Sequence, residues 1–163
     1  MRMLITPPAT ARDITVTISA GTDPIEGASV VIGTDYTGTT GDDGKVSFED
    51  VPLTETSISV TKTGFADYTG TITSGTVNIT MTAVRNISFT IDDGTDPIEG
   101  ASVVIGEITK TTGSAGGCSF TNITDGEHEV SVSAEGYSTS TSTITVDSTH
   151  NSFTVSLELQ GEG

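Results

Sequence analysis

Two copies of a short acidic string are the part of this sequence that most suggests chemistry. The string GTDPIEGASVVIG occupies residues 21–33 and recurs letter for letter at residues 94–106. Each copy carries an aspartate and a glutamate three residues apart, and these are Asp23, Glu26, Asp96 and Glu99. We predict that these carboxylates form an exposed acidic rim. The duplication itself is explained either by contact with a partner or by a recent copying of one scaffold.

The second copy lies in a denser acidic run, IDDGTDPIEG, at residues 91–100. Calcium prefers carboxylate and carbonyl oxygen ligands, so acidic loops of this kind can hold it weakly. A weak calcium site near Asp92, Asp93 and Asp96 is therefore the one cofactor that the sequence suggests. The acidic loop of the first repeat, TDYTGTTGDDG at residues 34–44, lacks the ligand spacing of a calcium loop.

Catalysis has little basis in this sequence. His128 and His150 have no counterpart in the first repeat, and no nucleophile or base pattern surrounds them. The single cysteine, Cys118, aligns with Val46, so we interpret it as a small buried hydrophobic residue. Four acidic residues of the first repeat are replaced by uncharged ones in the second: Asp42, Asp43, Glu49 and Asp50 become Ser114, Ala115, Thr121 and Asn122. We predict that the protein is not an enzyme.

The elements that must position these residues are short strands. Apolar and polar residues alternate in ITVTISAG at residues 14–21, and turn signals recur every 8–12 residues, which is typical of a small all-β protein. Inside the string, Gly27 and Gly100 are predicted to supply a flexible or left-handed backbone position before the strand. The predicted core positions of the string are Ile25, Ala28, Val30, Ile32, Ile98, Ala101, Val103 and Ile105.

The similarity extends beyond the string over about 70 residues. We predict two tandem sandwiches of seven strands each, at residues 13–84 and 85–160, with Val84 and Arg85 as a very short connection. An extended N-terminal arm at residues 1–12 precedes them. The order of P-I-x-G-A-x-V, T-G-x-x-G-x-x-x-F and V-x-x-x-G-[FY] in both repeats resembles the carboxypeptidase regulatory-like domain. The resemblance implies an Ig-like, or prealbumin-like, β-sandwich and a non-catalytic accessory, stalk or surface module.

The charge balance limits the partners. With 22 acidic and 6 basic residues, the net charge of −16 repels phosphate backbones and anionic lipid. No run approaches the roughly 20 apolar residues that cross a bilayer, and the N-terminus has no signal-peptide pattern. We therefore expect protein partners, with no nucleic acid and no membrane insertion.

The N-terminal arm is the segment most suited to assembly. A short apolar run and two prolines could add to the sheet edge of a neighbouring subunit; these residues are Met3, Leu4, Ile5, Pro7 and Pro8. The alternative is a frayed terminus. A surface glycan could instead contact Tyr36 or Tyr68.

The function that the sequence favours is a structural or interaction protein exposed on a surface. We expect a bacteriophage virion protein of the decoration, fibre or tail-associated kind, with capsid or tail subunits as partners. One alternative is a subunit of a bacterial or archaeal extracellular filament, or an adhesin stalk. Another is a carbohydrate-binding accessory domain of a processing enzyme. The protein is expected on a virion surface or outside the cell, in a homo-oligomer or a larger assembly.

Overall fold

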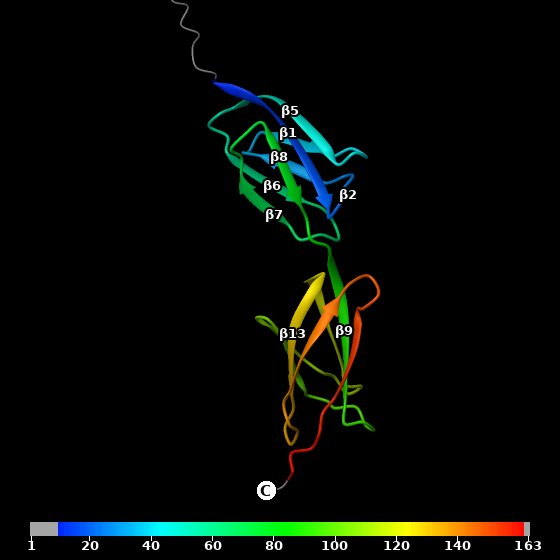
Figure 1. The fold of residues 1–163 in the computed structure, drawn as a ribbon. Coiled ribbons are helices and arrows are strands. Elements are labelled where there is room, and N and C mark those ends of the chain that lie inside the picture. The colour runs from blue at the N-terminus through cyan, green and yellow to red at the C-terminus, as the bar shows by residue number, and fades with distance from the viewer. Residues whose placement is uncertain (1–9, 162–163) are drawn as a thin grey trace, which may run out of the picture. The chain divides into compact units, whose positions relative to one another are not determined.

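The chain folds into two compact units that divide after Thr82 (Figure 1). The computed structural model describes residues 10–161, and all secondary structure in that range is β-strand. We call the units unit 1 and unit 2 and describe each by itself. Within residues 10–161, no helix is long and apolar enough to cross a membrane.

Unit 1 is a sandwich of two sheets (Figure 1). Its strands are β1 (Ala11–Ala20), β2 (Asp23–Pro24), β3 (Ser29–Ile32), β4 (Tyr36–Thr39), β5 (Lys45–Pro52), β6 (Ser57–Thr61), β7 (Tyr68–Thr71) and β8 (Thr76–Thr80). One sheet places β1 between antiparallel β5 and parallel β8, and the two-residue β2 pairs with the end of β1. The other sheet has the order β4-β3-β6-β7.

Unit 2 repeats this topology. Its strands are β9 (Val84–Asp92), β10 (Ser102–Ile105), β11 (Ile108–Thr111), β12 (Gly117–Thr124), β13 (Gly126–Ser133), β14 (Ser140–Val146) and β15 (Ser152–Ser156). The sheets have the orders β12-β9-β15 and β11-β10-β13-β14, and β15 runs parallel to β9. Apart from the short β2, each sandwich therefore has seven strands, which confirms the predicted fold.

Each unit has its own apolar core between its two sheets. The alternation in the first strand is confirmed, because Ile14, Val16 and Ile18 are fully buried. All eight core positions predicted within the duplicated string are also buried: Ile25, Ala28, Val30, Ile32, Ile98, Ala101, Val103 and Ile105. In each copy, four of the thirteen residues thus lie in the interior of their own sandwich.

The ends of the elements differ from the sequence-based boundaries by a few residues. Ala11 and Arg12, which we assigned to the arm, pair with Pro52 and Val51 and belong to β1. The remaining arm residues that we predicted for assembly lie outside the described residues: Met3, Leu4, Ile5, Pro7 and Pro8.

The connection between the units is shorter than the predicted one, because Val84 and Arg85 already belong to β9. The amide of Ala66 donates to the carbonyl of Thr82 at 2.9 Å within unit 1. The amide of Asp125 donates to the carbonyl of Ala83 at 2.8 Å within unit 2. The peptide bond between Thr82 and Ala83 therefore joins a residue hydrogen-bonded within unit 1 to a residue hydrogen-bonded within unit 2.

Candidate functional site

The duplicated string forms an exposed turn and the strand that follows it in each unit. Asp23, Glu26, Asp96 and Glu99 are all exposed, as an acidic rim requires. The predicted left-handed positions are confirmed, because φ is +70° at Gly27 and +77° at Gly100. A Cβ atom at either position would strain the backbone, because residues with a side chain rarely adopt this conformation.

A buried threonine forms hydrogen bonds with the turn of unit 1 from the interior of the sandwich. Thr40 is only 3% exposed. Its hydroxyl donates to the carbonyl of Ile25 at 2.6 Å and accepts from the amide of Ala28 at 2.9 Å. Its own backbone bonds to Gly27 and Ala28, at 2.8 and 3.0 Å. Four hydrogen bonds from one residue therefore fix residues 25–28.

Thr112 makes the same four bonds in unit 2, where it is 4% exposed. Its hydroxyl donates to the carbonyl of Ile98 at 2.7 Å and accepts from the amide of Ala101 at 2.9 Å. Its backbone bonds to Gly100 and Ala101, at 3.0 and 2.9 Å. Both copies of the string therefore form the same turn around a buried threonine, and in each unit all four bonds go to backbone groups of the string.

The suggested calcium site is not formed. Within residues 10–161, no three His, Cys, Asp or Glu side chains lie close enough together to hold a metal ion. Asp92 instead accepts from the amide of Gly94 at 3.0 Å, and Asp93 accepts from Asp96 and Thr95 at 2.8 and 3.0 Å. These amide bonds hold the pKa of Asp93 below its ordinary value. The carboxylates therefore close the turn of their own backbone.

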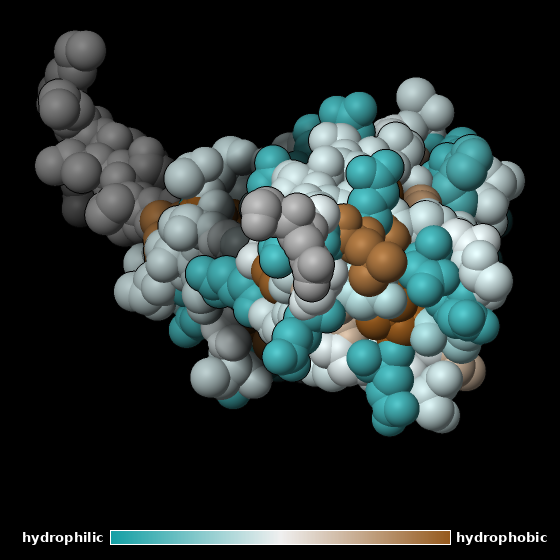
Figure 2. Space-filling model, turned by 90° about the horizontal axis from the view of Figure 1, so that it is seen from below, coloured by the Kyte–Doolittle hydropathy of each residue, from teal (hydrophilic) through white to brown (hydrophobic). Residues whose placement is uncertain are grey.

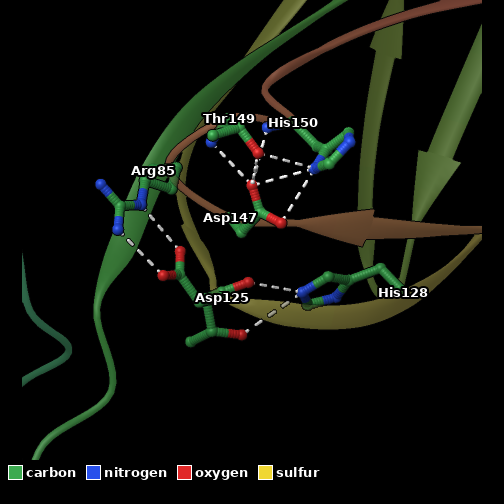
Figure 3. A network of polar contacts seen from close by, with 7 residues as sticks. Arg85, Asp125, His128, Asp147, Thr149 and His150 are labelled. Atoms are coloured by element: carbon green, nitrogen blue, oxygen red, sulfur yellow. Dashed lines mark hydrogen bonds and ion pairs between the residues drawn. The ribbon is translucent and has the colours of Figure 1, made fainter. Parts of the chain in front are cut away.

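A network of polar contacts that was not predicted lies in unit 2 (Figure 3). Arg85 at the start of β9 makes a bidentate pair with Asp125, with nitrogen–oxygen distances of 2.8 and 2.9 Å. The hydrogen bonds with Asp125 raise the pKa of Arg85. Both side chains are about a third exposed, so solvent partly screens this ion pair.

His128 and His150 both lie on the side of this pair that is away from Arg85 (Figure 3). The Nε2 of His128 is 2.7 Å from the carbonyl of Thr124 and must donate to it, because a carbonyl only accepts. Asp147 accepts from the hydroxyl of Thr149 at 2.7 Å and lies 2.9 Å from the Nδ1 of His150. The bonds with Thr149 and His150 hold the pKa of Asp147 well below its ordinary value. These contacts close loops and strand ends around β13 and β14.

Unit 1 has the equivalent arginine without the equivalent acid. Arg12 donates from a terminal nitrogen to the carbonyls of Glu55 and Ile72, at 3.3 and 3.4 Å. Its buried Nε has no hydrogen-bond partner within the described chain. Leu53 occupies the place of Asp125, because the amide of Leu53 donates to Thr10 as that of Asp125 donates to Ala83.

The aromatic and thiol side chains serve the cores. Tyr36 and Tyr68, which we considered as glycan contacts, are half-buried and pack against the core of unit 1. They therefore do not form an exposed platform. Cys118 is half-buried against the core of unit 2, as Val46 is in unit 1, and burial raises the pKa of its thiol.

Few large apolar side chains reach the surface. In the described chain these are Leu53, Ile108 and Leu159, which are 43%, 43% and 70% exposed. On the face seen in Figure 2, apolar areas are small and separated by hydrophilic side chains. The described surface therefore offers mainly polar groups for contact.

Comparison with known proteins agrees with the architecture. Residues 86–160, which lie in unit 2, match the family model of the carboxypeptidase regulatory-like domain, the family that the motifs of both repeats resemble. Unit 1 shares its strand order and the duplicated string. No curated protein sequence matches the chain.

Several solved structures are similar at low sequence identity. GBS52, the minor pilin of Streptococcus agalactiae, is 12% identical, with 94% of this chain and 98% of that chain covered and a TM-score of 0.43. The shaft pilin SpaA of Lactobacillus rhamnosus GG is 13% identical, with 94% and 99% covered and a TM-score of 0.39. A streptococcal ancillary pilin is 14% identical at a TM-score of 0.41; the alignment covers 95% of this chain but 64% of the pilin.

Proposed function

We propose that this chain is a non-enzymatic structural module of a protein displayed on a surface, with the two sandwiches acting as a stalk. The observation that carries the proposal is the pair of threonine hydroxyls beneath the duplicated string. The turn in each copy of the string is held by hydrogen bonds within its own unit, at Thr40 and at Thr112. The charged group around Arg85 likewise bonds to neighbouring backbone and side chains.

The setting that we favour is an extracellular filament or an adhesin stalk of a bacterium or archaeon. The family match of residues 86–160 supports this setting, because the resemblance to carboxypeptidase regulatory-like domains implies a non-catalytic accessory, stalk or surface module. The bacteriophage virion setting that the sequence favoured has no comparable support. The glycan-binding alternative is weakened by Tyr36 and Tyr68, whose rings pack against the core.

Partners of such a stalk are proteins with neutral or basic surfaces. The net charge of −16 gives long-range attraction to basic surfaces and repulsion from polyanions. The acidic rims at Asp23 and Glu26 and at Asp96 and Glu99 extend this charge to both units. Assembly through the N-terminal segment, by Met3, Leu4, Ile5, Pro7 and Pro8, belongs to the same proposal.

Immunogold electron microscopy tests the setting directly. Antibodies raised against the purified chain are applied to intact source cells and to particles released by lysis. Gold on envelope-attached structures supports the proposal, whereas gold only on phage particles replaces it with the virion setting. Gold confined to the cell interior in sections contradicts surface display altogether.

A truncation tests the role of the N-terminal segment. Deletion of residues 1–9 leaves β1 intact, because that strand begins at Ala11. We expect the truncated chain to fold normally and to be lost from the assembly. Equal incorporation of the full and truncated chains would exclude an anchoring role for these residues.

A further inference from the structure

Strand β13 is longer than its counterpart in unit 1. It covers Gly126–Ser133, whereas β6 covers only Ser57–Thr61. On one side, β14 pairs with β13 from Gly126 to Val132. On the other side, β10 pairs only with residues 130–133 of β13. Residues 126–129 of β13 therefore continue beyond the end of their neighbour.

Peptide groups at this uncovered edge point away from β14. In an antiparallel sheet, the N–H and C=O groups of successive residues point alternately to the two sides. In unit 1 the amide of Gly33 donates to the carbonyl of Ser57 at 3.0 Å. The peptide groups of Ser57 therefore point toward β3. Glu129 is the equivalent of Ser57, so Glu129 and Glu127 direct their peptide groups to the open side.

A hollow of about 290 Å³ lies beside this edge, between residues 104–106 at the end of β10 and residues 127–131 of β13. In unit 1 the corresponding place is occupied by a side chain. A Cβ atom added to Gly33 would collide with the carboxylate of Glu55, whereas one added to Gly106 would meet no atom within 4 Å. The same position is thus closed in unit 1 and open in unit 2.

We propose that this edge of β13 binds an extended segment of a partner protein that carries two basic side chains at alternate positions. Added strands bind through backbone hydrogen bonds, and their side chains select the site. Glu127 and Glu129 are exposed and lie two residues apart, so they face the same side of the sheet. Lysine or arginine side chains opposite them would form two cross-strand ion pairs.

The occupant is a different protein and not a second copy of this chain. The six basic residues of the sequence are Arg2, Arg12, Lys45, Lys62, Arg85 and Lys110, and no two of them are two positions apart. Of these basic residues, Arg85 already forms an ion pair with Asp125. The inference holds for any surface on which the chain is displayed.

A peptide titration tests the site. The probe is acetyl-Thr-Val-Lys-Thr-Lys-Val-Thr-amide, added to the ¹⁵N-labelled full chain and followed by NMR and calorimetry. We expect chemical-shift changes confined to residues 104–106 and 127–131. The same peptide with glutamate for both lysines should not bind. Shift changes spread evenly over both units would overturn the proposal, because they would indicate unspecific attraction to the acidic chain.

Two comparisons separate strand addition from simple charge attraction. Methylation of the backbone nitrogens of both peptide lysines keeps the charges and removes the donors that face β13, so binding should be lost. The double variant E127Q/E129Q should bind about tenfold more weakly, as expected for two surface ion pairs. The matched control in unit 1, Glu55→Gln, should bind as the parent does. Full binding of the methylated peptide, or equal weakening by Glu55→Gln, would contradict the proposal.

Discussion

Arg12 and Arg85 occupy equivalent positions in the first strands of the two units, and their surroundings differ. Arg85 has a bidentate carboxylate partner in Asp125, whereas Arg12 reaches two backbone carbonyls and leaves a buried Nε unpaired. Unit 1 has Leu53 where unit 2 has the acid. The hydrogen bonds beneath the string are therefore the same in both units, while the end of the sandwich near this arginine differs.

The constant part is the hydrogen bonding beneath the string, and the variable part is the length and charge of the β13–β14 hairpin. Gly44 and Gly116 illustrate the constant part. A Cβ atom at either would lie within 2.5 or 2.3 Å of a backbone carbonyl oxygen, of Ile18 or of Ile91. Both glycines also have positive φ, at +71° and +69°. Equivalent substitutions in the constant part should lower the free energy of unfolding of each unit by the same amount. Substitutions in the variable part should change the stability of only one unit.

The largest effect is expected from removing the internal hydroxyls. Thr40→Val should destabilise unit 1 and Thr112→Val unit 2, each by about 3 kcal/mol, because two buried backbone groups lose their partner. Hydrogen exchange of core amides by NMR measures each unit separately. The matched controls Thr39→Val and Thr111→Val alter exposed neighbours and should cost little. A loss in only one unit would show that the two turns are not equivalent.

Removing the acid from unit 2 should have a smaller effect, limited to that unit. Asp125→Leu copies the residue of unit 1 and leaves the half-buried guanidinium of Arg85 without its partner. We expect a loss of about 1–2 kcal/mol in the free energy of unfolding of unit 2. Adding Arg85→Met should recover part of it. If the double variant is no more stable than Asp125→Leu alone, the pair does not act as a unit.

Acid should weaken unit 2 through Asp147. The folded-state pKa of Asp147 lies below its unfolded value, so its contribution is complete above the unfolded pKa of about 4 and is lost as the pH falls further. Asp147→Asn should therefore flatten the fall in unit 2 stability between pH 5 and pH 2.5, measured by denaturant midpoints. Asp42→Asn, an exposed change in unit 1, serves as the control. An unchanged slope in Asp147→Asn would show that other carboxylates dominate.

Giving unit 1 the acid should stabilise it slightly. Leu53→Asp places a carboxylate where Asp125 lies in unit 2, within reach of Arg12. We expect a gain of about 0.5–1 kcal/mol, and the gain should shrink at high salt because the pair is partly exposed. Denaturant titration at low and high salt measures it. Destabilisation at both salt concentrations would mean that Arg12 cannot leave the carbonyls of Glu55 and Ile72.

The smallest effect is expected at Cys118. Cys118→Val copies Val46 and should change the stability of unit 2 by less than about 1 kcal/mol, since volume-conserving apolar exchanges are tolerated. Because burial raises the pKa of the thiol, alkylation at pH 7 should be slower than that of free cysteine. Rapid alkylation in the folded state would contradict this placement.

Much of the fold could be predicted from the sequence, because it depends on local patterns. Alternating apolar residues such as Ile14, Val16 and Ile18 indicate the strands, and turn residues mark where the strands end. Because the sequence is repeated, each of these patterns can be compared between two copies. The pairing of β1 with β5 and that of β9 with β12 each shift register once, next to Asp50 and next to Asn122. Asp50 and Asn122 have φ of +53° and +59°, a conformation that aspartate and asparagine tolerate better than most residues.

The polar contacts could not be predicted in the same way. Thr40 is one of many threonines, and only the folded chain brings its hydroxyl under Ile25 and Ala28. The pairing of Arg85 with Asp125 joins residues 40 positions apart. The open edge of β13 depends on where β10 ends, and strand ends are the least certain part of any pattern.

The parallel pairing of the first and last strands has a mechanical consequence for each unit. Tension on the chain ends pulls β1 and β8 in opposite directions along their shared axis. Five aligned pairs, from Thr15–Thr76 to Ser19–Thr80, then carry the load together in shear. Strands β9 and β15 repeat this arrangement from Ser88–Ser152 to Asp92–Ser156. Under tension, we therefore expect each sandwich to rupture in one step at high force instead of opening one hydrogen bond at a time.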